Sequence, residues 1–442
     1  MVRRSSPTNV LAAGLLAILV GAVMARQISG RGPAVWVIFL AGAFLMVALE
    51  ILSVSAAEAA LAGAAPVILF LFSLFLFAVA LEQAGVLDHL ARWLIGRARR
   101  PGDLPLVLFL GFGVASAFLV NDALVVIGVP LLISLARRLR TDPKPFLLTL
   151  AFAVTVGSAL TPFGNPQNLL VSVASGLTYP VAVFLRYLLL PIGISLGFGA
   201  WYVRRAFGSA ISSGGGEFDR VRATAPRLFP SGAWPERLLR APVLWVFPGT
   251  MIVILTLDLA AALTAGPVVP IWELAGAGAI LLLVVTPHRT RVVERVNWTV
   301  LLLFAGLFVV VGGAVSGGVV QAAERLLPLP TPSHPASAIV AIASGAILGP
   351  QVVSNVPWVA LQIPFLSALG FGAATPVPWV TLAAVSTLAG NVTLLGAASN
   401  LIVAEIAEKE RIPFRLGTFV RYGLPLAAVS ILVVTLSLLA GL

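Results

Sequence analysis

Residues 161–171 read TPFGNPQNLLV, and residues 393–403 read TLLGAASNLIV. Both stretches follow the pattern T-x-x-G-x-x-x-N-L-x-V, and they begin 232 positions apart. Each one interrupts a long apolar run with glycine and amide side chains. Irregular backbone at membrane depth is tolerated only where it is buried in protein or lines a watery cavity. Two such interruptions in corresponding halves of a chain predict the substrate site of a transporter.

The composition predicts an all-α polytopic protein of the cell inner (plasma) membrane, with the lipid bilayer as its partner. Hydrophobic residues make up 59% of the chain and charged residues 10%. Windows of about 20 apolar residues recur, enough to cross a bilayer core of roughly 30 Å as helix. A β-barrel would alternate apolar and polar residues instead. The net charge of +11 comes from arginines in short loops, where it sets topology, so no nucleic-acid partner is expected.

The sequence predicts neither a bound cofactor nor enzymatic activity. It contains no cysteine, which excludes disulfides and thiolate metal sites. Its histidines, His89, His288 and His334, stand near the ends of apolar runs and are too scattered for a metal cluster. There is no zinc-binding histidine pair, Ser/His arrangement or pair of carboxylates in the apolar runs.

The first membrane repeat is expected over residues 1–205. A hydrophobic stretch at about 104–136 is bracketed by arginines and broken at Asn121-Asp122, as in a re-entrant helical hairpin. A broken helix follows at about 145–176. The first apolar run, 9–25, resembles a cleaved signal peptide, but its counterpart in the second half favours a retained span.

A cytoplasmic linker is predicted at 206–240, followed by a second repeat over 241–442. This repeat has a hairpin at about 336–370 and a broken helix at about 377–408. Placing the arginine-rich loops in the cytoplasm makes the two hairpins open to opposite sides. The halves are therefore predicted to be inverted-topology repeats related by a pseudo-twofold axis in the membrane plane.

Both hairpin tips and both breaks are expected to meet near the bilayer midplane. Helix N-termini there favour anions, and exposed carbonyls suit a small cation such as Na⁺. Any one Asn or Thr at these positions can be explained as a helix cap. The occurrence of the same residues in both halves favours a site for substrate or ions. No other metal is expected. The candidate residues are Asn121, Asp122, Thr161, Gly164, Asn165, Asn168, Ser354, Asn355, Thr393, Gly396, Ser399 and Asn400.

Asp122 is the one carboxylate in this set, and the repeat does not require it, because Val356 takes the equivalent position. A carboxylate at membrane depth is costly and marks a functional candidate. We expect it to couple transport to protons. A cation ligand and a capping carboxylate are the alternative interpretations.

The motifs AFLVNDA (117–123), GNPQN (164–168), SNVP (354–357) and GNVTLLGAASNLIVAE (390–405) resemble signatures of the ion transporter superfamily. The similarity is to arsenite-permease-like and citrate-transporter-like anion permeases, over nearly the whole chain. It implies scaffold and transport parts in each repeat, elevator-type alternating access and, often, a homodimer. Neither tip completes the Ser-Asn-Thr triplet of sodium/dicarboxylate symporters. The Asn121-Asp122 pair is more similar to the proton-coupled arsenite-permease branch.

The sequence thus predicts a secondary active transporter of a small anion or oxyacid, arsenite being one candidate, with H⁺ or Na⁺ as coupling ion. Proton coupling through Asp122 is the favoured mechanism. A Na⁺/H⁺ antiporter and a Na⁺-coupled dicarboxylate symporter are alternatives within the same class. An ion channel is the alternative from another class, and hairpins that open to opposite faces argue against its continuous pore.

Overall fold

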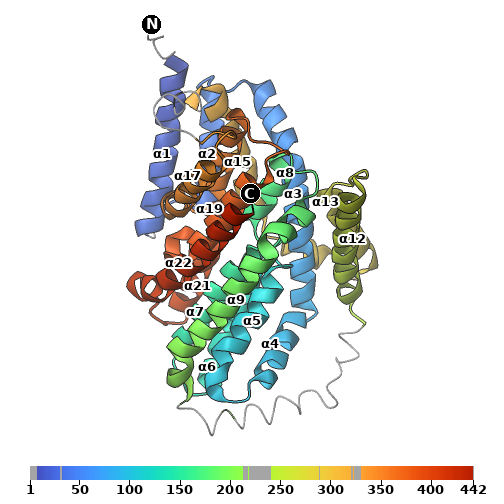
Figure 1. The fold of residues 1–442 in the computed structure, drawn as a ribbon, viewed down its shortest axis with the longest axis vertical. Helices are drawn as coiled ribbons and strands as arrows, with labels where there is room; N and C mark the ends of the chain where they lie inside the picture. The colour runs from blue at the N-terminus through green and yellow to red at the C-terminus, as the bar shows by residue number, and fades with distance from the viewer. Residues whose placement is uncertain are drawn as a thin grey trace.

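The described part of the protein is an assembly of helices, and most consecutive helices are joined by short loops (Figure 1). In the computed structural model the described residues are 7–29, 32–212, 218, 240–287, 289–319, 322 and 330–441, and they contain no β-strand. Within these ranges, six helices are long and apolar enough to cross a membrane. The predicted all-α membrane class is therefore confirmed.

The first half contains two helix interruptions inside apolar sequence, at 117–120 and at 159–165. Its helices are α1 (Pro7–Ser29), α2 (Val35–Ala48), α3 (Val54–Gln83), α4 (Val86–Arg97), the short η1 (Pro101–Asp103), α5 (Leu104–Ser116), α6 (Asn121–Arg138), α7 (Lys144–Ser158), α8 (Pro166–Ala174) and α9 (Pro180–Ser212).

The second half has the same order of long helix, two-armed hairpin, interrupted helix and final helix. Its elements are α12 (Val243–Thr264), α13 (Ile271–Val285), α14 (Arg289–Glu294), α15 (Trp298–Ser316), α17 (Pro335–Leu348), α18 (Pro350–Val353), α19 (Asn355–Ala368), α20 (Pro376–Leu388), η2 (Ala389–Asn391), η3 (Leu394–Gly396), α21 (Ala398–Lys409) and α22 (Leu416–Ala440).

The region between the halves differs from the sequence expectation at its start. Helix α9 continues to Ser212, so residues 206–212, which were expected in the linker, are helical. Apart from 218 and 240, the rest of the expected linker lies outside the described residues.

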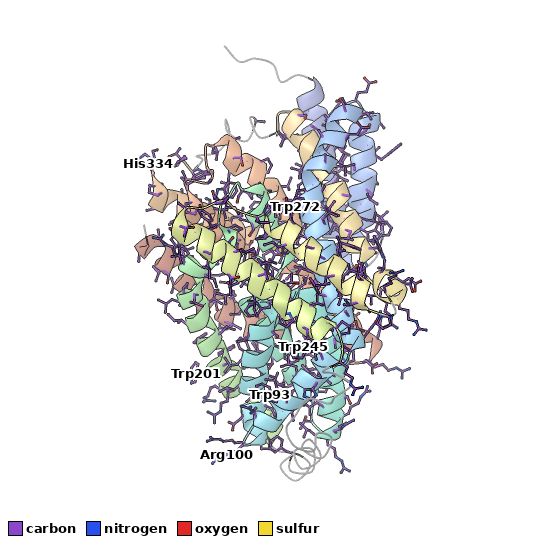
Figure 2. The ribbon with its side chains drawn as sticks, turned by 90° about the vertical axis from the view of Figure 1, so that its right-hand side faces the viewer. Trp93, Arg100, Trp201, Trp245, Trp272 and His334 are labelled. Carbon is purple, nitrogen blue, oxygen red and sulfur yellow. The ribbon has the colours of Figure 1, made fainter. Side chains whose placement is uncertain are left out.

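The two hairpins begin at opposite ends of the molecule. Arg100 precedes the first hairpin, His334 precedes the second, and the two residues lie far apart along the long axis (Figure 2). This is the arrangement that inverted repeats require. The inverted relation itself stays a prediction, which this arrangement supports.

The helices pack as two groups. In one group α15 packs against α2 and α3, and α13 packs against α3 and α12. In the other group α7 packs against α5 and α6, α20 packs against α17 and α22, and α6 packs against α21. The second group holds both hairpins and both interruptions, so the candidate site belongs to it.

Small residues set the closest helix crossings. A Cβ on Gly306 of α15 would lie 2.8 Å from the backbone nitrogen of Leu40 in α2. A Cβ on Gly157 of α7 would collide with the carbonyl of Gly113 in α5. Helices in lipid associate through this kind of close backbone approach, because no hydrophobic force drives them together.

Polar contacts show which loops share a face. Arg137 pairs with Glu410 at 2.7 Å, and Arg204 pairs with Asp103 at 2.9 Å. Exposed ion pairs of this kind stabilise a folded protein by about 0–1 kcal/mol, so they are used here only to show which helix ends lie close together. They place the ends of α6, α9 and α21 and the start of α5 on one arginine-rich face, the face that the sequence predicts to be cytoplasmic.

Asp258 joins the second half to the first inside the bundle. It is 4% exposed in the C-terminal half of the apolar helix α12, and its Oδ1 accepts a hydrogen bond of 2.7 Å from the backbone N–H of Ala182. Ala182 lies in the first turn of α9, where backbone N–H groups have no partner within the helix. Asp258 therefore caps a neighbouring helix.

We expect Asp258→Ala to lower the free energy of unfolding by about 1–2 kcal/mol, the usual cost of a lost cap. Asp258→Asn is the matched variant, because it keeps a carbonyl oxygen for the N–H of Ala182, and its loss should be smaller. Thermal unfolding of the purified variants measures both. An Asn variant as unstable as the Ala variant would contradict the role of the hydrogen bond and point to the charge alone.

Candidate functional site

The first hairpin tip and the first interruption are held together by their backbones. The N–H of Asn121 donates to the carbonyl of Gly164 at 3.0 Å, and the hydroxyl of Thr161 donates to the carbonyl of Ala117. A Cβ on Gly164 would lie 2.6 Å from Cα of Ser158 and 2.8 Å from the carbonyl oxygen of Ser116. Only glycine allows this approach, so the GNPQN motif fixes tip and interruption as one unit.

The amide groups of the first interruption replace the hydrogen bonds that the broken helix loses. Nδ2 of Asn168 lies 3.0 Å from the carbonyl oxygen of Ser158 and 3.1 Å from that of Thr161, both near the C-terminal end of α7. Oδ1 of Asn165 accepts from the N–H of Asn168 at 2.8 Å and so caps α8. Unpaired backbone groups at helix ends need such partners when they are buried.

Thr387 of α20 connects the second half to this interruption. Its Oγ1 lies 3.2 Å from Nδ2 of Asn165, 3.0 Å from Nε2 of Gln167 and 3.0 Å from Oδ1 of Asn168. All four side chains are buried. The first interruption is therefore a polar network closed by one hydroxyl from the other repeat.

We expect Thr387→Val to destabilise the protein strongly. Nε2 of Gln167 and Oδ1 of Asn168 would lose the one side-chain partner that each has here, at a cost of about 1–3 kcal/mol for each buried group. The unfolding midpoint of the purified variant is the measurement.

Thr155→Val is the matched control for this variant. Thr155 occupies the equivalent position in α7, and its hydroxyl donates only to the carbonyl of Ala151 in its own helix, at 2.9 Å. This substitution should shift the midpoint much less. Equal shifts in the two variants would contradict the bridging role of Thr387.

The second interruption repeats part of this plan. Nδ2 of Asn400 donates to the carbonyl of Gly390 at 2.7 Å, and Asn168 makes the same contact to Ser158, also ten residues earlier. Thr393 donates to Oε1 of Gln351 at 2.7 Å, so this interruption is also tied to its hairpin tip. The repeated Asn and Thr therefore have the same structural role in both halves.

The two interruptions differ in how well their polar atoms are satisfied. Oδ1 of Asn391, Oγ of Ser399 and Oδ1 of Asn400 are buried and find no hydrogen-bond partner among the described residues. Buried polar atoms normally have a partner, and an exception calls for an explanation such as a water or an ion. The second interruption thus presents oxygen atoms that a bound species can use.

The tip asparagines of the two hairpins adopt the same arrangement. Oδ1 of Asn121 accepts from the N–H of Asp122 at 2.9 Å, and Oδ1 of Asn355 accepts from the N–H of Val356 at 3.0 Å. Neither Nδ2 group makes a hydrogen bond to a described residue. No hydrogen bond among described residues joins one tip to the other. Each tip is thus attached to its own interruption and keeps an amide donor free.

The second tip is also strained. Ser354 has φ +69° and ψ 162°, a combination that an L-residue rarely adopts. Such strain costs about 1–3 kcal/mol and is usually found where function requires a particular backbone path. The equivalent Val120 has φ −54°, so the strain is confined to the second hairpin.

Asp122 opens onto a cavity of about 320 Å³ between α3, α6 and the start of α15. The side chain is 7% exposed, and its carboxylate makes no hydrogen bond or ion pair with a described residue. The polar residues that line the cavity with it are Glu82, Arg295 and Asn297. Asp122 therefore faces a cavity that charged side chains also line.

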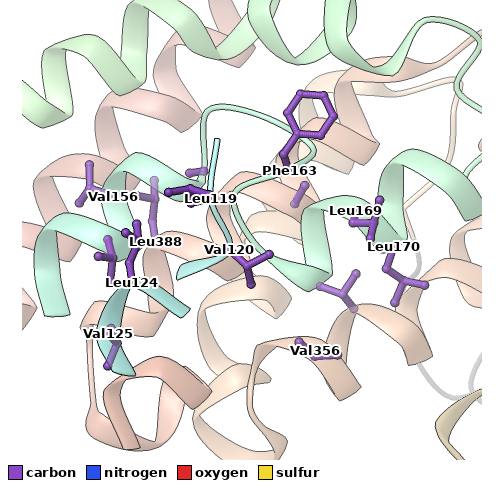
Figure 3. Close-up of a cluster of buried hydrophobic side chains, with 14 of the residues drawn as sticks. Leu119, Val120, Leu124, Val125, Val156, Phe163, Leu169, Leu170, Val356 and Leu388 are labelled. Atoms are coloured by element: carbon purple, nitrogen blue, oxygen red, sulfur yellow. The ribbon is translucent and has the colours of Figure 1, made fainter. Parts of the chain in front are cut away.

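Apolar side chains enclose the first interruption (Figure 3). Val120 and Val356, each from a hairpin tip, lie in this cluster with Leu169 of α8 and Phe163. Phe163 also stacks on Phe70 of α3, with ring centroids 5.9 Å apart. No arginine or lysine is buried among the described residues. The buried polar groups of the site are therefore amides, hydroxyls and the carboxylate of Asp122.

Sequence reasoning missed several residues of this site: Thr387, Gln351, Asn391 and Gln167. Asn391 had a signal, because it is an amide next to a glycine within an apolar run, close to the second motif. Gln167 lies inside the quoted GNPQN motif. Thr387 and Gln351 had no signal of their own, since their partners are distant in the chain.

Comparison with known proteins agrees with this architecture. A family model described as citrate transporter (CitMHS) matches residues 16–389. An uncharacterized transporter of Mycobacterium bovis, Mb2703, is 30% identical over 384 residues, 83% of each chain. The silicon efflux transporter LSI3 of Oryza sativa is 26% identical over 412 residues, 84% of each chain.

A solved structure shares the fold. The YdaH transporter of Alcanivorax borkumensis, described as having an unusual topology, superposes with a TM-score of 0.51 at 16% identity and covers 98% of each chain. With a family model that matches most of the sequence, the chain belongs to the citrate transporter family and is a multi-pass transporter of the plasma membrane.

Proposed function

We propose that the protein is a proton-coupled secondary active transporter of a small, hydroxyl-rich oxyacid or its anion. One observation carries the proton-coupling part. Asp122 is a carboxylate at a hairpin tip that pairs with no described residue, and it faces a cavity of about 320 Å³ that Glu82 and Arg295 also line. A group that binds and releases a proton during transport needs both burial beside the substrate and access to water.

The chemistry of the site supports a neutral or weakly charged substrate. Amide N–H groups of Asn121 and Asn355 and the hydroxyl of Ser399 are donors or acceptors for hydroxyl and oxo groups. A multiply charged carboxylate such as citrate would leave several charges without a cationic partner, because Arg295 is the one arginine or lysine in the described lining of the Asp122 cavity and no described arginine or lysine is buried. An oxyacid of arsenic or silicon fits this set better, in line with the name of the silicon efflux relative.

An elevator movement is the transport mechanism that we propose. Hydrogen bonds attach each hairpin tip to its interruption, and Thr387 attaches the second half to the first interruption. These contacts lie within the helix group that holds both hairpins. That group therefore forms one block, which would move as a unit past the group of α2, α3, α13 and α15. The homodimer implied by the family resemblance stays a prediction.

Sodium is the second candidate for the coupling ion. At the second interruption, Oδ1 of Asn391, Oγ of Ser399 and Oδ1 of Asn400 are buried oxygens that no described residue partners. Neutral oxygens of this kind are ligands for hard cations, and broken helices hold Na⁺ in other transporters. A Na⁺/H⁺ exchanger would use the same oxygens without an oxyacid.

Proton flux in proteoliposomes tests the proposal. A pH dye inside the vesicles would report the response to arsenite, silicate, sulfate, phosphate, succinate and citrate, each with and without Na⁺, and protein-free vesicles give the baseline. We expect a pH change with arsenite or silicate that does not depend on Na⁺. A response to Na⁺ alone would overturn the oxyacid assignment, and single-channel currents would overturn secondary transport.

A further inference from the structure

The arginine-rich end of α9 forms a second, separate pocket. Its volume is about 420 Å³, and its lining comes from η1 with the residues before it and from the last turns of α9. Arg100, Arg204, Arg205, Trp201 and Ser209 are among the lining residues. None of them belongs to the transport site described above.

Close backbone contact shapes this pocket. A Cβ on Gly208 of α9 would lie 2.9 Å from the carbonyl oxygen of Gly102 in η1, so the two elements approach as closely as glycine allows. Asp103 of η1 pairs with Arg204 at 2.9 Å, and the Asp103 side chain is 20% exposed. The pocket therefore lies between two elements that are fixed to one another.

The charge of the pocket is positive. Its lining includes three arginines and one carboxylate, and that carboxylate pairs with Arg204. Arg100 and Arg205 form no ion pair with a described residue. Two guanidinium groups thus remain for an anion, and guanidinium groups bind phosphate oxygens in paired, directional hydrogen bonds.

The pocket lies where a membrane surface would be. Trp201 is 59% exposed on α9, which is long and apolar enough to span a bilayer. Trp93 is 47% exposed and has the guanidinium of Arg97 over its ring at 4.3 Å. Trp93, Trp201 and Arg100 all lie toward the same end of the molecule (Figure 2). Exposed tryptophans beside arginines mark the level of the lipid headgroups.

We propose that this pocket binds the phosphate headgroup of an anionic membrane phospholipid. Arg100 and Arg205 donate to the phosphate oxygens, and Trp201 lies against the glycerol and upper acyl region. Basic pockets between helices on the cytoplasmic side have the chemistry for such headgroups. A soluble phosphate would use the arginines but not the exposed tryptophan, so the lipid is the ligand that explains both.

Lipid binding to the full-length protein tests the assignment. The protein in neutral detergent is titrated with short-chain phosphatidylglycerol, phosphatidylcholine or inorganic phosphate, and bound lipid is counted by native mass spectrometry. We expect one tightly held phosphatidylglycerol, with binding to the double variant Arg100→Gln/Arg205→Gln weaker by roughly tenfold or more. Phosphatidylcholine and inorganic phosphate should not compete.

A charge-matched control is Arg138→Gln/Arg291→Gln, which removes two arginines outside the pocket. Its phosphatidylglycerol affinity should stay within about twofold of the parent protein, since neither residue lines the pocket. Equal weakening in both double variants would overturn the site in favour of general surface charge. Competition by inorganic phosphate at the phosphatidylglycerol affinity would overturn the lipid assignment. Lipid binding is measured without transport, so this test can fail or succeed independently of the proposed substrate.

Discussion

Asp122→Asn is expected to reduce oxyacid-driven proton flux by about 100-fold or more, which is the lower end of what a positioned proton donor or acceptor contributes to catalysis. The amide has the shape of a protonated carboxyl group but cannot release a proton. Since the parent carboxylate makes no hydrogen bond or ion pair with a described residue, the change breaks no structural contact. The variant should therefore fold normally and lose coupling alone.

Two measurements separate coupling from folding. Substrate counterflow between equal concentrations requires no net proton movement, so it should persist in Asp122→Asn. Glu82→Gln is the matched control, because Glu82 lines the same cavity but is exposed, and its effect should stay below about tenfold. Proton movement with the substrate at the parent stoichiometry in Asp122→Asn would contradict the coupling role.

Asp122→Val is a second test of the same position, because the second repeat has a valine, Val356, at the equivalent position. Val356 begins the second arm of the second hairpin next to Asn355 and is accommodated in the apolar cluster. Valine at 122 is therefore expected to be compatible with the hairpin fold. A folded Asp122→Val protein without proton flux would assign the carboxylate to transport and not to structure.

Both interruptions were predictable from the sequence because apolar membrane helices rarely contain glycine and several amides together. Gly164, Asn165 and Asn168 have no place in a lipid-facing helix, and the structure uses them to close the ends of α7 and α8. The same reasoning held for Asn400, whose contact to Gly390 matches that of Asn168. Residues that hydrogen-bond to the backbone of a broken helix can therefore be identified from their type and from their position in the apolar run.

The partners across the bundle were not predictable. Thr387 and Thr155 look alike in the sequence, and both donate to a carbonyl four residues earlier. Only the path of α20 past the first interruption makes Thr387 a bridge. The sequence analysis did not single out Asp258, although it is a carboxylate in an apolar run, and nothing local identifies the N-terminus of α9 as its partner. Contacts between distant segments depend on tertiary packing that propensity does not encode.

The asymmetry of the two interruptions was also hidden. The shared pattern suggests equal sites, yet Asn165 is replaced by Ala397, and Asn391 takes the position of Ala159. Among the described residues, Oδ1 of Asn391, at one exchanged position, is buried without a hydrogen-bond partner, and so are Oγ of Ser399 and Oδ1 of Asn400. No side-chain atom of residues 159–168 is left in that state. The repeated positions thus make the contacts that the two halves share, and the two halves differ in their unpartnered oxygens.

Gly164→Ala is expected to be the most damaging single-methyl substitution in the site. The added Cβ would lie 2.6 Å from Cα of Ser158 and 2.8 Å from the carbonyl oxygen of Ser116. These are backbone atoms of α7 and α5, which cannot move aside as a flexible side chain can. The cost should exceed the usual overpacking penalty of about 1–3 kcal/mol, and little folded protein should be recovered.

Two other glycines serve as controls. They separate the effect of a steric clash from the effect of replacing glycine by alanine. A Cβ on Gly396 would meet its nearest neighbours at 3.0 Å, one of them the side-chain oxygen of Gln351, so Gly396→Ala should be milder. A Cβ on Gly21 would meet nothing within 4 Å, and Gly21→Ala should raise helix stability by roughly 1 kcal/mol. The yield of monodisperse protein and its unfolding midpoint rank the three variants.

The ranking tests how the first tip is held. The carbonyl of Gly164 accepts from the N–H of Asn121, so a loop displaced by the new methyl would also release the residue before Asp122. If Gly164→Ala folds partially, its remaining transport should therefore be uncoupled from protons as well as slow. If Gly164→Ala were as stable as Gly21→Ala and still coupled to protons, the close backbone approach at Gly164 would not be what holds the first hairpin tip to the first interruption.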